Sequence, residues 1–149
     1  MHRAFVPFLL TLVLGISALP AAAATVVDAT IDVHSVFGEP GTFTADSDVL
    51  CGEGTTSDVT RVTGRGRTLT IHNLKTFTCQ DGSGTFTLRL EAQVKPCDST
   101  DQGAWSVAGG TGDYERLRGA GNLVGTYFPN DACDAEGIDD HLTGTLVLP

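Results

Sequence analysis

The sequence predicts an all-β protein, a single domain built as an antiparallel β-barrel of about eight strands. Three observations lead to this prediction. No window shows a sustained apolar period of about 3.6 residues, which an amphipathic helix would need. Several short segments instead alternate apolar with polar residues. A glycine-rich stretch over residues 105–121 lies between two of these segments and is typical of a tight barrel corner.

The first 24 residues have the layout of a secretory signal peptide. A positive start at Arg3 precedes an apolar run over residues 4–19, and residues 21–24 are alanines that offer cleavage after Ala23 or Ala24. The apolar run is shorter than the roughly 20 residues of a membrane span, so we expect no membrane span. We predict a signal peptide over residues 1–24 and a secreted domain over residues 25–149.

Acidic residues outnumber basic ones, 18 against 9, for a formal net charge of −9. Removing the signal peptide removes only Arg3, which brings the net charge from −9 to −10. Such a chain repels phosphates and anionic membranes. Nucleic acid is therefore not expected as a partner.

All four cysteines lie in the mature domain, at positions Cys51, Cys79, Cys97 and Cys133. An even number of cysteines in a secreted chain predicts two disulfides. No Cys-x-x-Cys pair is present, which disfavours a zinc or thioredoxin-like site. Four cysteines can form two disulfides in three different ways. We favour Cys51–Cys79 and Cys97–Cys133, because neighbours along a strand meander tend to be neighbours in space.

The expected strands begin at residues 27–33, where Val27, Ala29, Ile31 and Val33 alternate with polar residues. Turn residues over 38–41 end this segment. A short strand follows over 42–45, and a further one begins over 59–62 before a turn at 64–66.

A hairpin is expected next, from a β-rich run over 69–79 and a strand over 85–94, joined by residues 81–84. In this run His72 has the opposite parity to Leu69 and Ile71, which predicts a surface position. Segments 105–108, 121–128 and 142–148 complete the set. Strand number and spacing alone suit a sandwich as well as a barrel.

The glycine-rich stretch predicts a corner between two strands. Gly109, Gly110 and Gly112 let the backbone reverse where a Cβ would clash, and Gly119 lets the next strand start close to its neighbours. Between them, Asp113 is expected to cap a single helical turn that places Tyr114 and Leu117 on one side. A phosphate-binding loop is disfavoured because no long helix follows and the surroundings are acidic.

The segment Gly109-Gly-Thr-Gly-Asp-Tyr114, together with Gly119, resembles the Gly-Gly-Thr/Ser-Gly-x-Phe/Tyr corner of the allene oxide cyclase and dirigent β-barrels. Residues 76–88 and 105–121 are similar to small secreted bacterial proteins grouped with that barrel. The resemblance implies an eight-stranded antiparallel barrel with an apolar cavity open at one end. Its enzymes isomerise, cyclise or steer the coupling of hydrophobic small molecules. It assigns no catalytic residue to this chain.

Two function classes follow from these observations. In the first, the domain binds a hydrophobic small molecule, with an isomerase-like or cyclase-like activity left open, and Trp105 and Tyr127 contact the ligand. The alternative role for Trp105 is a core anchor whose indole N–H meets a carbonyl. In the second class, the domain is a secreted interaction module, such as a protease inhibitor or an envelope-associated protein, that acts through its loops.

The histidines and the acidic segments are the remaining candidates for a catalytic or metal site. His34, His72 and His141 are scattered, and no Gly-x-Ser-x-Gly elbow occurs, which disfavours zinc and hydrolase sites. Residues 130–140 are densely acidic; they match no EF-hand spacing, so calcium binding stays open beside a solvated loop. Residues 98–101 are expected in a turn. We predict no cofactor and no metal, and the oligomeric state is not set by the sequence.

Overall fold

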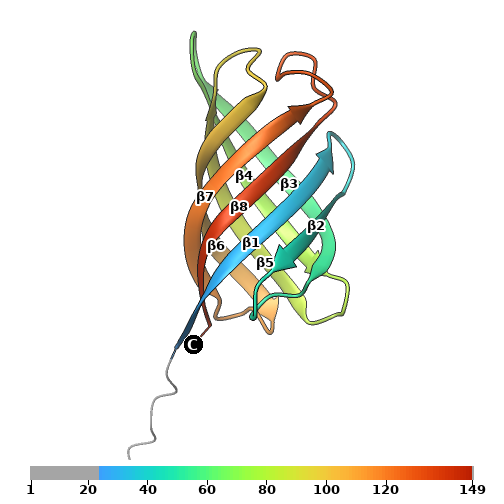
Figure 1. The fold of residues 1–149 in the computed structure, drawn as a ribbon, viewed down its shortest axis with the longest axis vertical. Helices are drawn as coiled ribbons and strands as arrows, with labels where there is room; N and C mark the ends of the chain where they lie inside the picture. Colours follow the sequence, from blue (N-terminus) through green and yellow to red (C-terminus); the bar gives the residue numbers. More distant parts are fainter. Residues whose placement is uncertain (1–23, 149) are drawn as a thin grey trace, which may run out of the picture.

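A computed structural model describes residues 24–148, which form one closed barrel of eight antiparallel strands without a helix (Figure 1). The strands are β1 (Thr25–Val36), β2 (Gly41–Asp46), β3 (Glu53–Gly64), β4 (Leu69–Cys79), β5 (Gly84–Val94), β6 (Thr100–Gly112), β7 (Arg118–Phe128) and β8 (Gly137–Leu148). The predicted fold class is confirmed. The predicted signal peptide lies, except for Ala24, outside the described residues. Within the described part, no helix could cross a membrane.

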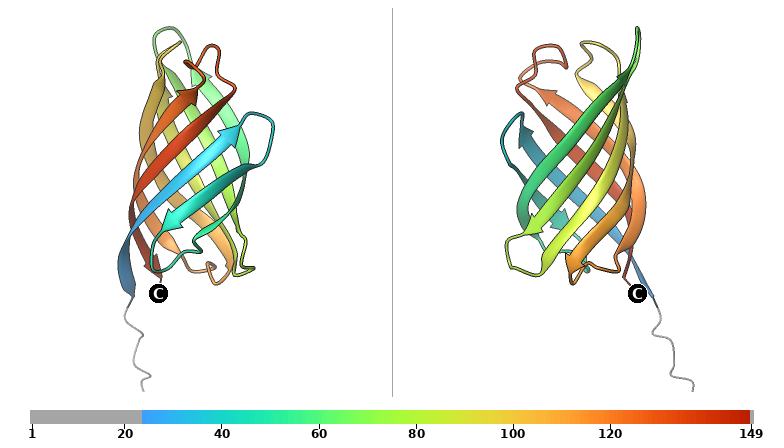
Figure 2. Two further views of the ribbon diagram at one scale, coloured as in Figure 1. Left: turned by 45° about the vertical axis from the view of Figure 1, so that its right-hand side comes forward. Right: turned by 180° about the vertical axis from the view of Figure 1, so that it is seen from behind.

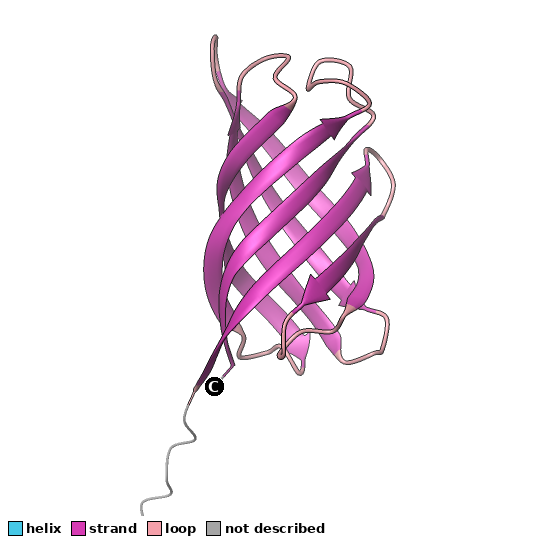
Figure 3. Ribbon diagram, in the orientation of Figure 1, coloured by secondary structure: helices cyan, strands magenta, loops and turns pink. Residues whose placement is uncertain are grey.

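Each strand pairs with the next along the chain, and β1 pairs with β8 over its whole length to close the barrel. The strands run steeply inclined around the long axis (Figure 2). Connections therefore gather at two opposite ends (Figure 3). We call the end with connections 47–52, 80–83 and 113–117 the plugged end. The cavity end carries connections 37–40, 65–68, 95–99 and 129–136.

The alternation read from the sequence places the core inside the barrel. On β5, Phe86, Leu88, Leu90, Ala92 and Val94 are buried. Successive strand residues point to opposite faces, so the intervening residues of β5 face outward. The same parity buries alternate residues of β1, from Ala29 to Ser35.

Two expectations about polar segments are wrong. Residues 98–101 were expected in a turn, yet β6 begins at Thr100 and Asp101 is buried. Residues 130–140 were open to a solvated loop, yet β8 begins at Gly137 and Asp140 is buried. Both segments carry a charged residue at an inward position, so an apolar alternation could not mark where the strand starts.

The plugged end is filled by aromatic rings. Phe77 and Phe86 stack with centroids 4.6 Å apart, and Phe43 meets both edge-on. Tyr114 covers this group from the β6–β7 connection, with its ring 5.4 Å from that of Phe86. The Tyr114 hydroxyl accepts a hydrogen bond from the Cys51 backbone N–H at 3.0 Å. Tyr114 thus closes the interior and satisfies a buried backbone donor.

The glycine corner forms this closure. Gly112 has φ of +61°, the left-handed region that glycine adopts at low cost. The connection is a turn: the Leu117 N–H donates to the Tyr114 carbonyl at 3.1 Å, and both side chains are buried. They lie on one side as expected, in a hydrogen-bonded turn shorter than a helix.

Both predicted disulfides are confirmed. Cys51–Cys79 lies at the plugged end, where it joins the β2–β3 connection to the end of β4, with Cα atoms 5.9 Å apart. Cys97–Cys133 lies at the cavity end, where it joins the β5–β6 and β7–β8 connections, with Cα atoms 4.7 Å apart. Each end of the barrel thus carries one covalent link.

Candidate functional site

A cavity of about 640 Å³ occupies the cavity end of the barrel. Its volume falls in the range of roughly 300–1,000 Å³ that small-molecule sites have. Phe37 and Val62 stand at its mouth and are 54% and 56% exposed. Apolar side chains form most of the wall: Val36, Phe37, Val62, Leu69, Ile71, Leu90, Ala92, Val94, Leu123 and Ile138.

The short strand β2 shapes one side of this cavity. It has 6 residues, whereas the two strands beside it have 12 each. Its pairing with β3 runs only from Gly41 opposite Thr56 to Thr44 opposite Glu53. Within the described chain, residues 57–64 of β3 therefore pair with β4 alone. The wall beside them is formed by the β1–β2 connection, residues 37–40, which also lines the cavity.

We call the inner end of the cavity, which carries Asp58, Lys75, Asp101 and Asp140, the floor. A buried lysine lies at its centre. Lys75 of β4 is 1% exposed, and its side chain reaches residues of three other strands. Its Nζ donates to Asp140 Oδ2 of β8 at 2.8 Å and to Ser35 Oγ of β1 at 3.2 Å. It also lies 3.6 Å from Asp58 Oδ1 of β3. A buried ammonium needs such partners, because isolated burial of a charge costs several kcal/mol.

A third acid, Asp101, lies on the same floor. Asp101 of β6 is 3% exposed and accepts from the Tyr127 hydroxyl at 3.0 Å and from the Gly125 backbone N–H at 3.1 Å. Gly125 is the ladder partner of both Asp101 and Asp140. A Cβ at position 125 would come within 2.5 Å of Asp101 Oδ1, so glycine makes room for the carboxylate.

Burial shifts the acidity of these groups. It raises the pKa of Asp140 above the ordinary value, and the nearby Lys75 opposes that rise. Burial also raises the pKa of Asp101, against the hydrogen bond from Tyr127. The pKa of Tyr127 is raised as well, first by burial and then by the charge of Asp101, so its hydroxyl stays a donor at neutral pH.

The floor carries one buried acceptor, Asn73 Oδ1, without a partner among the described residues. Asn73 donates through Nδ2 to Asp58 Oδ1 at 3.4 Å. Lys75 Nζ donates to Asp140 and Ser35 and lies within ion-pair distance of Asp58. The Asn73 Oδ1 atom is thus free to receive a hydrogen bond from a ligand.

The two residues predicted to contact a ligand lie in different places. Tyr127 lines the cavity. Trp105 is buried below it, with its indole N–H donated to the Thr143 carbonyl at 3.2 Å. A Cβ at Gly121 or Gly144 would come within 2.7 Å of the indole ring, so these glycines make the space for Trp105. A ligand-binding role for either residue stays a prediction.

The glycine corner lies at the other end of the barrel from the cavity. Gly109, Gly110 and Gly112 lie at the end of β6, Tyr114 follows in the turn, and Gly119 is the second residue of β7. Sequence reasoning did not single out Lys75, Asp58, Asp101 or Asp140 as site residues. Lys75 had a usable signal, because it shares the parity of Leu69 and Ile71 on β4.

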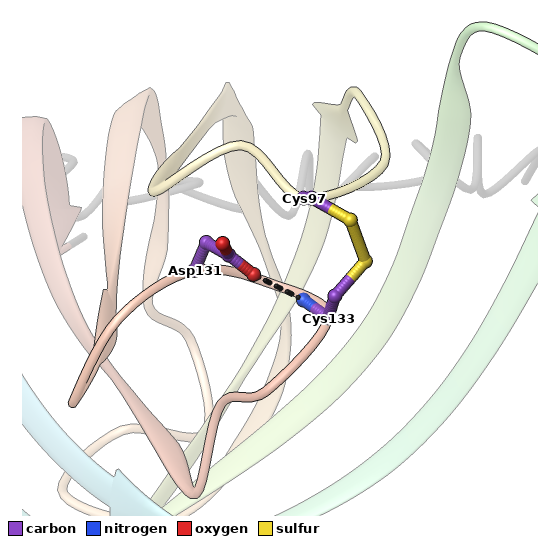
Figure 4. A group of neighbouring side chains, drawn as sticks. All are labelled: Cys97, Asp131 and Cys133. Atoms are coloured by element: carbon purple, nitrogen blue, oxygen red, sulfur yellow. Dashed lines mark hydrogen bonds between the residues drawn. A yellow bond between two sulfur atoms is a disulfide. The ribbon is translucent and has the colours of Figure 1, made fainter.

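Among the described residues one group has metal-ligand atoms close together: Cys97, Asp131 and Cys133 (Figure 4). The two sulfurs form a disulfide and are not thiolates, which metal binding requires. Asp131 Oδ1 accepts from the Cys133 N–H at 2.9 Å. Further along, Asp139 pairs with His34 on the outer face while Asp140 points inward. The acidic carboxylates of residues 130–140 thus face different directions.

The histidines of the described chain, His34, His72 and His141, lie on the outer face. His34 and His141 pair with Asp139 and Asp32 across β1 and β8, both at 2.6 Å. His72 points outward, as its parity predicts, and its Nε2 lies 3.1 Å from Thr63 Oγ1. They therefore stand apart from the cavity.

No protein-family model, curated protein or solved structure matches the chain. The resemblance to the allene oxide cyclase and dirigent barrels stays a prediction. The cavity and its floor are the features from which a function can be inferred.

Proposed function

We propose that the protein is secreted and binds a hydrophobic small molecule inside the barrel. The observation that carries this proposal is the cavity of about 640 Å³, whose walls are apolar and whose floor holds buried charged groups. Small-molecule sites commonly combine an apolar wall with a few polar groups that orient the ligand. Two disulfides favour an oxidising compartment outside the cytoplasm.

The strength of binding follows from the apolar area that a ligand would bury. Each buried CH₂ group contributes about 0.8 kcal/mol before the cost of immobilising the ligand. Burial of a ten-carbon chain contributes about 8 kcal/mol before that cost, so we expect a Kd weaker than the roughly 1 µM to which 8 kcal/mol corresponds.

The test uses N-phenyl-1-naphthylamine, a neutral probe that fluoresces in apolar surroundings. The mature protein should enhance its fluorescence, and decan-1-ol should displace it. Ala92→Trp places a large ring in the cavity from the β5 wall and should weaken probe binding at least tenfold. Gln93→Trp adds the same ring at the next, outward position and should leave binding unchanged.

Two results would contradict the proposal. One is a wild-type protein that does not bind the probe. The other is an Ala92→Trp variant that melts cooperatively and still binds the probe as the wild type does. Native mass spectrometry of protein purified from its own culture medium gives an independent reading, because a retained small molecule adds a discrete mass.

The interaction module remains the alternative function. A protein that emerges without a ligand and binds no lipophilic probe would favour it. An isomerase-like or cyclase-like activity also stays a prediction, because no reacting pair of groups is assigned on the floor.

A further inference from the structure

We infer that the ligand of this cavity is a protonated amine on an apolar body, with the ammonium group seated on the acidic floor and the apolar part against the upper wall. This inference rests on the proposed function, since it specifies the ligand of the same cavity. It follows from three observations: the charge of the floor, the use of its donors, and the position of the apolar side chains.

The floor holds more acids than bases. Asp58, Asp101 and Asp140 line the cavity, and Lys75 is the only basic residue of its lining among the described residues. With all four groups ionised, the floor has a charge of −2. A bound cation would compensate part of that charge in a place where water cannot fully do so. An anionic head group would instead add to it.

The hydrogen bonds of the floor also favour a cationic ligand. Lys75 Nζ donates to Asp140 and Ser35 and pairs with Asp58 at 3.6 Å, and the Tyr127 hydroxyl donates to Asp101. Two acceptor atoms remain. Asp140 accepts from Lys75 through Oδ2, which leaves its Oδ1 for a ligand. Asn73 Oδ1 is buried and has no partner in the described chain. A ligand with several N–H donors satisfies these oxygens, whereas a carboxylate would meet acceptors with acceptors.

The apolar side chains fix the orientation. Leu69, Val94 and Val62 belong to the strand ends nearest the mouth, and Phe37 lies in the β1–β2 connection. Lys75 lies deeper, opposite Leu88 on β5 and next to the aromatic group that begins at Phe77. The polar group of the ligand therefore points inward and its apolar chain points outward.

All ionisable groups that face this site must be counted. They are Glu39 from the β1–β2 connection, Asp58 from β3, Lys75 from β4, Asp101 from β6, Tyr127 from β7 and Asp140 from β8. Protonation of Asp101 and Asp140 would remove the excess negative charge. Amine binding should therefore weaken as the pH falls through the raised pKa values of these two acids.

The experiment measures displacement of N-phenyl-1-naphthylamine by decylamine, decan-1-ol and decanoate near neutral pH. Decylamine should bind about tenfold more tightly than decan-1-ol, and decanoate should bind most weakly. About 0.5 M NaCl is present throughout, because salt screens the general attraction of amines to an acidic protein.

Asp101→Asn removes one floor charge and keeps an acceptor for Tyr127. It should weaken decylamine binding about fivefold to tenfold and leave decan-1-ol binding unchanged. Asp28→Asn makes the same change of net charge at an exposed position of β1 and should leave both affinities unchanged. Asp58→Asn provides a second floor variant, with the same expectation, if Asp101→Asn does not fold.

The outcomes separate the two proposals. Equal binding of decylamine and decan-1-ol to the wild type would overturn the amine inference while the binding function stands. Tightest binding of decanoate would also overturn it and would assign recognition to Lys75. Failure of the probe and of all three competitors to bind would overturn the binding function itself.

Discussion

The two ends of the barrel are built from the same strands, yet they fill their interiors differently. At the plugged end, inward residues of β4 and β5 are Phe77 and Phe86, whose buried rings stack and fill the interior between the strands. A few residues along the same strands, Lys75 and Leu90 face a cavity. Strand alternation alone therefore does not decide whether a barrel is solid. The size and charge of the inward residues decide it. Aromatic rings fill the plugged end, and we propose that the cavity end binds a ligand.

The largest effect is expected at the cavity floor. Lys75→Met should lower the free energy of unfolding by about 3–5 kcal/mol, because it leaves Asp140, which is 7% exposed, without its charge partner. The double variant Lys75→Met with Asp140→Asn removes both charges and should recover most of the loss. Urea unfolding measures both. A single variant as stable as the double would show that the pair is not coupled.

The disulfides should be similar in stability and different in function. Each closes a loop, with sequence separations of 28 and 36, and removing either pair by Cys→Ala should cost about 3–4 kcal/mol in thermal or urea unfolding. Below the melting transition, only loss of Cys97–Cys133 should weaken probe binding, because that bridge joins connections at the cavity end. Weakened binding after loss of Cys51–Cys79 would contradict the separation of the two ends.

A smaller effect is expected from single hydroxyl groups. Tyr114→Phe leaves the buried Cys51 N–H without its acceptor and should cost roughly 1–3 kcal/mol of unfolding free energy, with probe binding unchanged. Tyr127→Phe removes one donor to Asp101 and should cost roughly 0.5–1.5 kcal/mol. Urea unfolding and probe titration of the two variants give the comparison. A larger loss of unfolding free energy in Tyr127→Phe than in Tyr114→Phe would contradict this expectation. It would show that the hydroxyl group at the cavity end contributes more to stability.

The smallest effect concerns pH, and its sign should differ between the ends. Burial raises the pKa of Asp101, so its contribution to stability is fully present below the unfolded-state pKa and is lost as the pH rises through the folded-state pKa. At the plugged end, the side-chain and backbone hydrogen bonds from Ser83 lower the pKa of Asp81, so its contribution is lost on acidification.

Acidification from neutral pH should therefore stabilise the wild type relative to Asp101→Asn and destabilise it relative to Asp81→Asn. Urea unfolding of the three proteins at several pH values provides the measurement. Parallel pH profiles for all three would contradict the expectation.

Much of the fold could be predicted because it depends on local pattern. Apolar alternation marked β1 and β5, and the turn residues before β5 marked a hairpin. The start of β3 was missed because residues 53–58 are Thr-rich and polar on both faces, so no alternation marks the strand. The order of the cysteines predicted both disulfides, since the chain runs as a meander.

The site was less accessible to prediction. The parity that placed His72 outside also places Lys75 inside, and this signal was available in the sequence. Asp101 and Asp140 offered none, because each lies near the start of a strand that follows turn-like residues. Their significance depends on Lys75, which is far away in the sequence and reaches Asp140 only across the closed barrel. The spacing of residues within one strand does not indicate contacts between residues that are far apart in the sequence.

The shortness of β2 has a consequence for the flank of the barrel beside β3. In the described chain, residues 57–64 of β3 have no strand beyond them on the β2 side, and the β1–β2 connection forms the wall there. This flank is therefore covered by a connection and not by a hydrogen-bonded strand. An unpaired strand edge invites pairing with another chain, and the charges of Asp58 and Arg61 along it discourage such pairing. The edge is thus protected against aggregation by its own side chains.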